Sequence, residues 1–232
     1  MCFLRTNEMN TFISNLTSIL FNTHTNTPQS HNTFLFVGGV VRDYLLYLTA
    51  TQNKITNISP SLYQAPVNAL FYNFLEQQKD IDISSVLKPN DIAKMLDNAG
   101  IKRVRNFATY RIQDNGHQFD ITSTRIDSNC DGRHAKMDFG VSYFQDSIRR
   151  DFTFNALYMN SQGIIFDFHS GIKHLLQNQI HFIGNTRSRI LEDYTRIKRY
   201  YNFSKRFGIR NLEIEKEIDY IMNNSTTPII MR

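Results

Sequence analysis

The chain has 232 residues, a mass of 27.1 kDa and a formal net charge of +5, and 41% of its residues are hydrophobic. A chain of this length can bury one substantial core or two modest ones, and the composition argues against a disordered protein. Its two cysteines, Cys2 and Cys130, indicate neither a disulfide framework nor a zinc site, and no apolar run approaches the length of a membrane span. Because Glu8 interrupts the N-terminal apolar stretch where a secretory signal would be continuous, we expect a soluble cytoplasmic protein.

The first third of the chain is expected to form one strand between helices. Apolar residues at helical spacing predict an amphipathic helix over 9–20, and FLFV at 34–37 predicts a buried strand that leads into a helix over 40–48. The polar, proline-punctuated segment 50–66 is expected to be a long connection, and a short helix is predicted over 67–77.

The middle of the chain predicts further strands and one helix. KDIDISS (79–85) has the composition of a strand, and a helix is predicted near 90–98 with Asn90 as its N-cap. KRVRNFATYRI and HQFDITSTRI alternate in strand fashion around the turn-like DNG, whereas DSNCDGRHAK (127–136) has no periodicity and is expected to be a loop.

From residue 151 onward the pattern is mainly helical. A single long helix is predicted, with its apolar face marked by Ile190, Tyr194 and Ile197 and its end by Gly208, and another helix follows it. The sequence therefore predicts a mixed α/β part followed by an all-helical part.

Two aspartates lie one residue apart in the predicted strand KDIDISS. A strand alternates its faces, so Asp80 and Asp82 are expected on one side, about 7 Å apart along the strand. Their like charges repel unless a cation lies between them, and Mg²⁺ takes one or two carboxylates together with substrate phosphates. Two such ions support an in-line displacement at a phosphate. The alternative is an exposed edge strand with solvated aspartates.

Gly38 and Gly39 come directly after the first predicted strand and open a helix. Glycines at this place let the backbone approach a phosphate, whose charge is favoured by the N–H groups and the dipole of the helix start. Arg42, one turn into the helix, can add a charge-assisted bond to a phosphate oxygen. The alternative is an ordinary packing turn, but the glycine turn and the later D-x-D strand together favour nucleotidyl transfer.

Basic residues crowd the segment 187–210. The net charge alone only mildly favours a polyanionic partner, but this clustering favours nucleic acid. The residues are Arg187, Arg189, Arg196, Lys198, Arg199, Lys205, Arg206 and Arg210.

Four motifs, in order, resemble those of class II, bacterial-type CCA-adding tRNA nucleotidyltransferases, whose relatives include bacterial poly(A) polymerases. They are GGVVRD (38–43), DIDIS (80–84), RRDFTFNALY (149–158) and EDYTRIKR (192–199). The resemblance covers roughly residues 34–208, and RRDFTFNA is its strongest match. It implies an α+β protein with a polymerase β-like nucleotidyltransferase head at 1–160, a mixed sheet with flanking helices, followed by an all-helical neck at 161–232 that reads the incoming base.

The resemblance also implies roles for individual residues. Asp80 and Asp82 hold Mg²⁺ for catalysis, and Asp120 on the neighbouring strand supports the metal site. The implied nucleotide-binding residues are Gly38, Gly39, Arg42, Arg150, Asp151, Asn155, Glu192, Asp193, Arg196 and Arg199. The basic residues expected to contact tRNA are Arg187, Arg189, Lys205 and Arg206.

Asp193 and Arg196 are three residues apart, and on one helix they would share a face. Cytosine and adenine both present an amino donor beside a ring-nitrogen acceptor, which a carboxylate beside a guanidinium matches. Uracil and guanine present the reverse pattern and would leave both protein groups unpaired. Each bidentate contact discriminates against the wrong base by about 1–3 kcal/mol. The alternative for this pair is an ordinary surface ion pair.

The chain departs from the family pattern in several places. The body and tail domains, which hold the tRNA elbow, are expected to be absent, because only about two dozen residues follow Gly208. The connection from Asp43 to Asp80 is longer than usual, and His174 and His181 stand where the family commonly has Asp and Arg, at the hinge between head and neck.

The sequence therefore predicts an enzyme that adds CCA to the 3′ end of immature tRNA from CTP and ATP, with Mg²⁺ as cofactor, tRNA as partner and no membrane association. The loop at 127–136 takes the place of the family's flexible loop, which helps the switch from C to A. Alternatives are a partial activity, namely CC-adding, A-adding or poly(A) polymerase, or a non-catalytic tRNA-binding remnant or half of a two-chain enzyme. A protein partner or an oligomer is not indicated.

Overall fold

The computed structural model describes residues 16–20, 32–67, 69–114, 116–128 and 136–224. The elements in chain order are β1 (Phe34–Val37), α2 (Gly39–Ala50), β2 (Thr56–Ser59), β3 (Leu62–Gln64), α3 (Ala69–Leu75), β4 (Asp80–Ser85), α4 (Pro89–Asn98), β5 (Val104–Asn106), β6 (Thr109–Asp114), β7 (His117–Ser123), β8 (Arg125–Ser128), β9 (Lys136–Phe139), α5 (Tyr143–Ile148), the 3-10 helix η2 (Thr153–Asn155), β10 (Leu157–Met159), β11 (Ile164–Asp167), α6 (Gly171–Leu176), α7 (Thr186–Glu192), α8 (Thr195–Phe207) and α9 (Leu212–Asn224). Residues 16–20 are helical, and the rest of the helix predicted over 9–20 lies outside the described residues.

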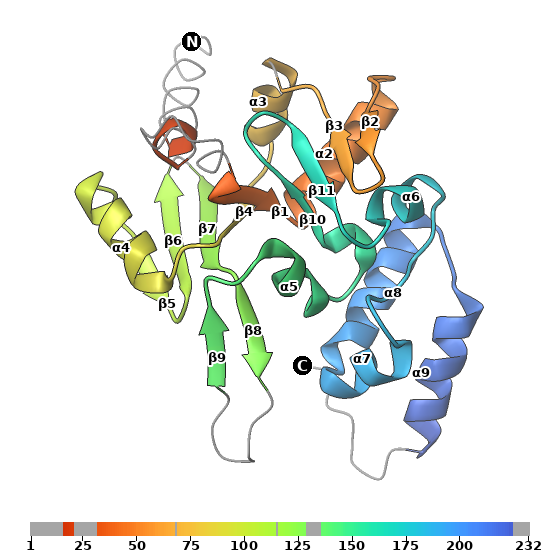
Figure 1. Cartoon of the computed structure of the whole chain (residues 1–232). Helices are drawn as coiled ribbons and strands as arrows, with labels where there is room; N and C mark the ends of the chain where they lie inside the picture. The colour runs from red at the N-terminus through yellow and green to blue at the C-terminus, as the bar shows by residue number, and fades with distance from the viewer. Residues whose placement is uncertain (1–15, 21–31, 68, 115, 129–135, 225–232) are drawn as a thin grey trace.

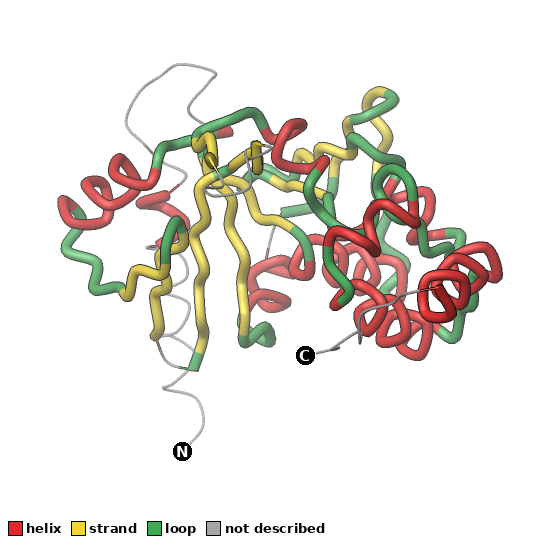
Figure 2. Tube along the Cα trace, turned by 90° about the horizontal axis from the view of Figure 1, so that it is seen from below, coloured by secondary structure: helices red, strands yellow, loops and turns green. Residues whose placement is uncertain are grey.

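The head is built on a mixed sheet (Figure 1). Its strands lie in the order β2-β3-β11-β10-β1-β4-β7-β6-β5, and β4 and β7 run parallel whereas the other described neighbours run antiparallel. Beside the sheet, α7, α8 and α9 gather at one end of the molecule (Figure 2). The predicted mixed sheet with flanking helices, followed by a helical part, is therefore confirmed. None of the described helices combines the length and the apolar character that crossing a bilayer would need.

Several local predictions were wrong, three of them in elements of the head. Segment 50–66 contains β2 and β3, which pair with each other and extend the sheet beside β11. Strands β10 and β11 interrupt the helical pattern expected from residue 151, because they pair with each other and also with the distant strands β1 and β3. The N-cap of α4 is Lys88 instead of Asn90, because the fixed φ of Pro89 suits the first helical position.

The sheet continues past residue 160, where the predicted head ends, because β11 pairs with both β10 and β3. The division into a head at 1–160 and a neck at 161–232 stays a prediction. Below, the neck denotes α7, α8 and α9.

Asp146 is a fully buried carboxylate on α5. It accepts hydrogen bonds from Arg149 Nε (2.8 Å), Arg150 Nη2 (3.2 Å), Tyr158 Oη (2.8 Å) and the Arg125 backbone N–H (3.1 Å). Burial raises the pKa of Asp146, but the two arginines outweigh this effect and hold the pKa below its usual range. Through these bonds, Asp146 connects Arg125 of β8 and Tyr158 of β10 to the segment that leads into η2.

The neck packs against the head through phenylalanine rings. The rings of Phe152 and Phe154 pack edge to face against the ring of Phe203 on α8. The distances between ring centroids are 5.5 Å for Phe152 and 5.1 Å for Phe154. Phe154 also lies 5.7 Å from Phe207, and Phe152 lies 4.7 Å from Phe182. The two phenylalanines of RRDFTFNALY therefore form the joint between the head and the neck, where aromatic packing adds to the burial of apolar area.

Two histidines lie against the other side of η2. The rings of His174 and His181 are 4.2 Å apart between their centroids. Thr153 forms a hydrogen bond with His174 Nδ1 through its hydroxyl (2.9 Å), and its N–H donates to His181 O (3.1 Å). Burial lowers the pKa of His174, and His181 and Lys173 lower it further against the opposing effect of Asp167.

Replacement of Asp146 is expected to destabilise the fold. Asp146→Asn should lower the free energy of unfolding by about 3 kcal/mol, near the lower end for breaking a buried ion pair, because both arginines keep some contact with solvent. Urea unfolding measures the loss. The matched control is Asp97→Asn, which alters an ion pair with Arg103 at a solvent-exposed carboxylate and should have a much smaller effect. Equal losses in the two variants would contradict the anchoring role of Asp146.

The lowered pKa of His174 predicts a loss of stability in mild acid. The unfolded chain takes up a proton near the usual histidine pKa of about 6.5, whereas the folded chain resists protonation, so the free energy of unfolding falls with pH below that value. His174→Gln should make this decline shallower between about pH 7.5 and about pH 5.5. Thermal melting over that range checks it, and an unchanged slope would show that His174 does not contribute.

Candidate functional site

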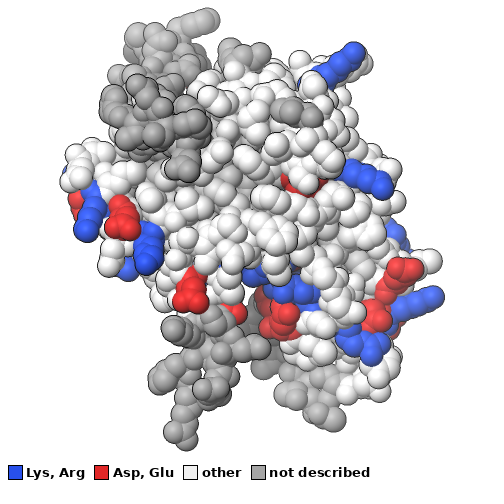
Figure 3. Space-filling model, in the orientation of Figure 1, with Lys and Arg blue, Asp and Glu red and all other residues white. Residues whose placement is uncertain are grey.

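A cleft of about 1250 Å³ lies between the head and the neck. Its lining comes from the β1–α2 turn, β4, β8, α5, the segment that enters η2, and the helices α7 and α8. Basic and acidic side chains gather in this lower half of the molecule (Figure 3). The predicted residues that line it are Gly38, Gly39, Arg42, Asp82, Arg150, Asp151, Asn155, Arg189, Glu192, Asp193, Arg196 and Arg199. The fold thus brings residues of all four motifs to one space, and their individual roles stay predictions.

Three predicted carboxylates lie on two neighbouring strands. Asp80 and Asp82 occupy the exposed face of β4 while Ile81 and Ile83 are buried, which confirms the predicted alternation. Asp120, on the parallel strand β7, is in register with Asp82. Topology therefore places the three acidic residues close together on the sheet.

Asp82 is the one of the three that lines the cleft. Asp120 instead accepts two bonds from Arg111, at 2.8 and 2.7 Å. Asp82 is open to the cleft, but the walls around it remove part of its hydration, which raises its pKa. Arg150 opposes this increase, whereas the negative charges of Asp120 and Asp80 add to it.

The carboxylates on β4 suit a hard divalent cation that takes most of its ligands from water and from substrate phosphates. Within the described residues, no group of three or more His, Cys, Asp or Glu side chains is placed to hold a metal ion. Mg²⁺ usually keeps several waters and uses one or two carboxylates plus substrate phosphates, so Asp80 and Asp82 meet its needs. The raised pKa of Asp82, from desolvation and from like charges, is an unfavourable state that a bound cation would relieve.

The β1–α2 turn has the geometry that its two glycines predict. Gly38 has a φ of +69°, in the left-handed region that glycine adopts without strain, and its N–H donates to Leu157 O at 3.2 Å. The first turn of α2 carries no acidic side chain. The helix start, with Gly38 and Gly39 in the cleft lining, is therefore open to an anion.

Arg42 lines the cleft but is already bonded within the protein. Its Nη1 donates to Asn155 Oδ1 at 2.7 Å, and its Nε and Nη2 donate to the Asp43 carboxylate at 2.8 and 2.9 Å. Asp43 accepts a further bond of 2.9 Å from Arg206 on α8. The predicted contact of Arg42 with a triphosphate stays a prediction, and it would use the guanidinium N–H groups that these bonds leave over.

Asp151 continues this polar network into the neck. One carboxylate oxygen accepts from the N–H of Phe152 at 2.8 Å and from Asn155 Nδ2 at 3.1 Å. The other oxygen lies 2.6 Å from Arg199 Nε on α8. Because Asn155 also accepts from Arg42, one network joins α2, η2 and α8 along the wall of the cleft.

The base-selecting motif does not lie on one helix, contrary to the prediction. Helix α7 ends at Glu192, and Asp193 is extended, with a φ of −156°. The Asp193 carboxylate accepts from the N–H and the hydroxyl of Thr195, at 2.9 and 2.7 Å, and so satisfies the first N–H of α8, whose N-cap residue is Tyr194. Burial raises the pKa of Asp193, but these bonds and the charges of Arg196 and Arg199 bring it below its usual range.

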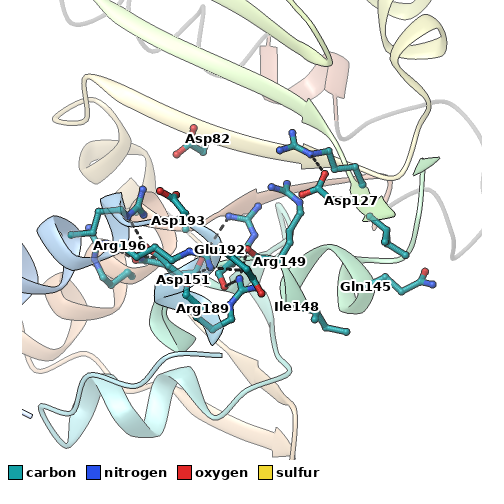
Figure 4. Close-up of a pocket in the computed structure, with 18 residues that line it drawn as sticks. Asp82, Asp127, Gln145, Ile148, Arg149, Asp151, Arg189, Glu192, Asp193 and Arg196 are labelled. Atoms are coloured by element: carbon teal, nitrogen blue, oxygen red, sulfur yellow. Dashed lines mark hydrogen bonds and ion pairs between the residues drawn. The ribbon is translucent and has the colours of Figure 1, made fainter. Parts of the chain in front are cut away.

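Arg196 is held by a carboxylate and by backbone carbonyls. Its Nη1 donates to Arg189 O at 2.6 Å and to Glu192 Oε2 at 2.9 Å, and its Nη2 donates to Arg149 O at 3.2 Å. Arg189 in turn donates to the carbonyl oxygens of Arg149 and Arg150, at 2.6 and 2.7 Å. Figure 4 shows Asp82 on the head side of the cleft and the labelled residues of α7 and α8 on the neck side.

The residues predicted to contact tRNA lie in different surroundings. Arg189 faces into the cleft, as described above. Arg187 pairs with Glu217 on α9 at 2.6 Å, and Arg206 bonds to α2. Lys205 is exposed. Their contact with tRNA stays a prediction.

Six residues of the lining were not predicted from the sequence. They are Arg125, Ile126, Asp127, Gln145, Ile148 and Arg149. The doubled arginine in RRDFTFNALY is a signal that could have included Arg149. The segment 125–127 comes from the β8–β9 hairpin, whose pairing no local pattern indicates. The loop predicted over 127–136 is shorter than expected, because residues 127–128 belong to β8 and residue 136 belongs to β9. The remainder, residues 129–135, lies outside the described residues.

Comparison with known proteins places these features in a family. A family model described as the poly A polymerase head domain matches residues 34–181, more than half of the chain. The human CCA tRNA nucleotidyltransferase 1, mitochondrial, is 35% identical over 129 residues, which are 54% of this chain and 30% of that protein. The CCA-adding enzyme of Staphylococcus saprophyticus is 30% identical over 175 residues, which are 75% of this chain and 37% of that protein.

A solved structure supports the fold. The Thermotoga maritima CCA-adding enzyme in complex with a tRNA matches with a TM-score of 0.57 at 22% identity, over 96% of this chain and 47% of that one. The chain spans about a third of the length of the curated relatives described above. From the family match, the shared sheet and the four motifs that meet in one cleft, we conclude that the chain belongs to the poly(A) polymerase head-domain family.

Proposed function

We propose that the protein is a tRNA nucleotidyltransferase that adds CCA to the 3′ end of immature tRNA from CTP and ATP. The observation that carries the proposal is the cleft, in which the strand carboxylate Asp82 and the neck motif 192–196 line one space. The similarity to CCA-adding enzymes supports the same reaction. The chain spans about a third of the length of these relatives, so we propose its substrates instead of inferring them from the similarity alone. We also propose a cytoplasmic location.

The charge of the cleft suits a nucleoside triphosphate. Seven arginines and five acidic side chains line it, so positive charge is in excess even before any metal binds. The start of α2 and Arg42 would contact the phosphates, and Arg199 would add charge from the neck side. Asp80 and Asp82 would hold Mg²⁺, which when bound would activate the tRNA 3′-hydroxyl and stabilise the leaving pyrophosphate.

Base selection would use Asp193 and Arg196. The Asp193 carboxylate accepts a bond from the amino group of C or A, and the Arg196 guanidinium donates to the neighbouring ring nitrogen. In the free protein Arg196 binds Glu192 and backbone carbonyls instead. Base recognition would turn Arg196 from these partners toward Asp193 at a cost that is equal for all bases, so the discrimination would come from the pairing edge of the base.

The reaction is tested by sequencing tRNA 3′ ends. Purified protein with Mg²⁺, CTP and ATP is expected to extend a tRNA transcript that lacks CCA to one that ends in CCA. Asp82→Asn should lower the rate at least about a thousandfold, because the metal site loses a charged ligand, while the fold is kept. Ends that stop at CC, gain only A or carry long A tracts would identify a partial activity. Unextended ends would contradict the proposal.

Nucleotide choice is tested by replacing the neck arginine. Arg196→Ala should reduce the preference of the enzyme for CTP over UTP by roughly tenfold to a hundredfold, because the reversed pattern of uracil no longer faces an unpaired guanidinium. Single-turnover incorporation of each nucleotide measures the preference. Arg210→Ala, which removes an exposed arginine that pairs with Glu215 outside the cleft, is the matched control and should keep the preference. An unaltered preference in Arg196→Ala would remove this residue from base selection.

A further inference from the structure

A second hollow of about 640 Å³ lies on the outer side of the head. We call it the α4–β9 groove. It is lined by the first turns of α4, by Arg105 of β5 and by residues 137–139 of β9. Figure 1 shows α4 and β5 beside the base of the β8–β9 hairpin, away from the neck helices. None of the four sequence motifs contributes to this groove.

The groove and the cleft share one hairpin. Residues 125–127 of β8 line the cleft, and residues 137–139 of β9 line the groove. These two segments pair with each other as antiparallel strands. Neighbouring strands are about 4.8 Å apart. A strand of RNA whose end lies in the cleft would therefore meet the groove after crossing a single pair of strands.

Three cations surround the groove and form no ion pair with any residue that the structure describes. Lys88, Lys94 and Arg105 are exposed, and within the described residues none of them forms an ion pair. The acidic residues Asp91 and Asp138 also line it, so the cations exceed the acids by one. Figure 3 shows this mixture of basic and acidic side chains over the region where Figure 1 places α4.

An aromatic pair stands beside these cations. Phe107 is 61% exposed, and its ring lies 5.6 Å from that of Phe139 in edge-to-face geometry. The backbone of Phe107 has a φ of +57°, a left-handed conformation that is strained for a bulky residue. Arg105 Nε donates to Phe107 O at 3.0 Å, which leaves the rest of its guanidinium for other partners. Such an exposed ring on a strained turn is typical of a functional position.

We propose that the α4–β9 groove binds a segment of the substrate RNA near the 3′ end that enters the cleft. Lys88, Lys94 and Arg105 contact its phosphates, and Phe107 stacks on an unpaired base. Exposed cations that form no ion pair among the described residues favour a polyanion over a protein surface, and the shared hairpin places the groove next to the cleft. The inference rests on the proposed function, since it concerns the RNA on which the cleft acts.

The groove is tested by RNA affinity at several salt concentrations. The variant Lys88→Ala/Lys94→Ala/Arg105→Ala, in the full chain, is titrated with a tRNA transcript that lacks CCA, followed by fluorescence anisotropy from about 50 to about 200 mM KCl. We expect Kd to rise roughly tenfold at the lowest salt, and the slope of log Kd against log salt to become flatter by about one for each phosphate that the variant no longer binds. Phe107→Ala should weaken binding by about tenfold with the salt dependence unchanged, because stacking involves no counterion release.

The matched control removes the same charge elsewhere. Lys54→Ala/Lys173→Ala/Lys216→Ala replaces three exposed lysines that lie outside the groove, and its affinity should stay close to that of the unaltered protein. CTP binding by equilibrium dialysis should be equal in all variants, and equal melting temperatures show that the fold is intact.

The outcomes separate the two proposals. If the unaltered protein extends tRNA to CCA but the groove variants bind RNA as tightly as the lysine control, the groove proposal is overturned and the proposed function stands. If the unaltered protein neither binds nor extends tRNA, the proposed function falls and the groove proposal falls with it. Normal RNA binding together with capture of a protein through Phe107 would also overturn the groove proposal, in favour of a protein partner.

Discussion

The arrangement of the cleft depends on the buried carboxylate of Asp146. A carboxylate removed from water needs compensating charge and hydrogen bonds, and here two arginines, a tyrosine hydroxyl and a backbone N–H supply them. These bonds fix the backbone at Arg149 and Arg150, whose carbonyl oxygens then receive the neck arginines Arg189 and Arg196. One acidic residue on the head thus sets where the neck side chains lie.

The head and the neck are joined by apolar and by polar contacts, which respond differently to a ligand. In the phenylalanine joint, Phe152 and Phe154 are buried and Phe203 is partly buried, and such apolar contact is non-directional. The network through Asp151 and Arg199 is directional and borders the cleft, so an anionic ligand competes with its carboxylate for the arginine. If a nucleotide binds as proposed, it would rearrange the polar wall, while the aromatic joint would hold the two parts together.

Features that depend on nearby residues could be predicted, and features that depend on distant partners could not. The shared face of Asp80 and Asp82 follows from strand alternation, and the turn at Gly38 follows from backbone sterics. The hairpin β2–β3 was missed because its polar strands are stabilised by pairing with β11, about a hundred residues later. The helix break at Asp193 was missed because apolar periodicity continues across it. Only the hydrogen bond from the Thr195 N–H to the Asp193 carboxylate reveals it.

That break bears on how base selection would work. On a continuous helix, Asp193 and Arg196 would be held in one fixed relation whatever ligand was present. At this junction between two helices, the bonds from Thr195 hold the Asp193 carboxylate, whereas Arg196 is bound by groups on the cleft wall. The two halves of the contact can then be brought together by the base itself. Cytosine and adenine differ in size, so an acceptor that is fixed beside a donor that moves would suit the proposed recognition of both bases.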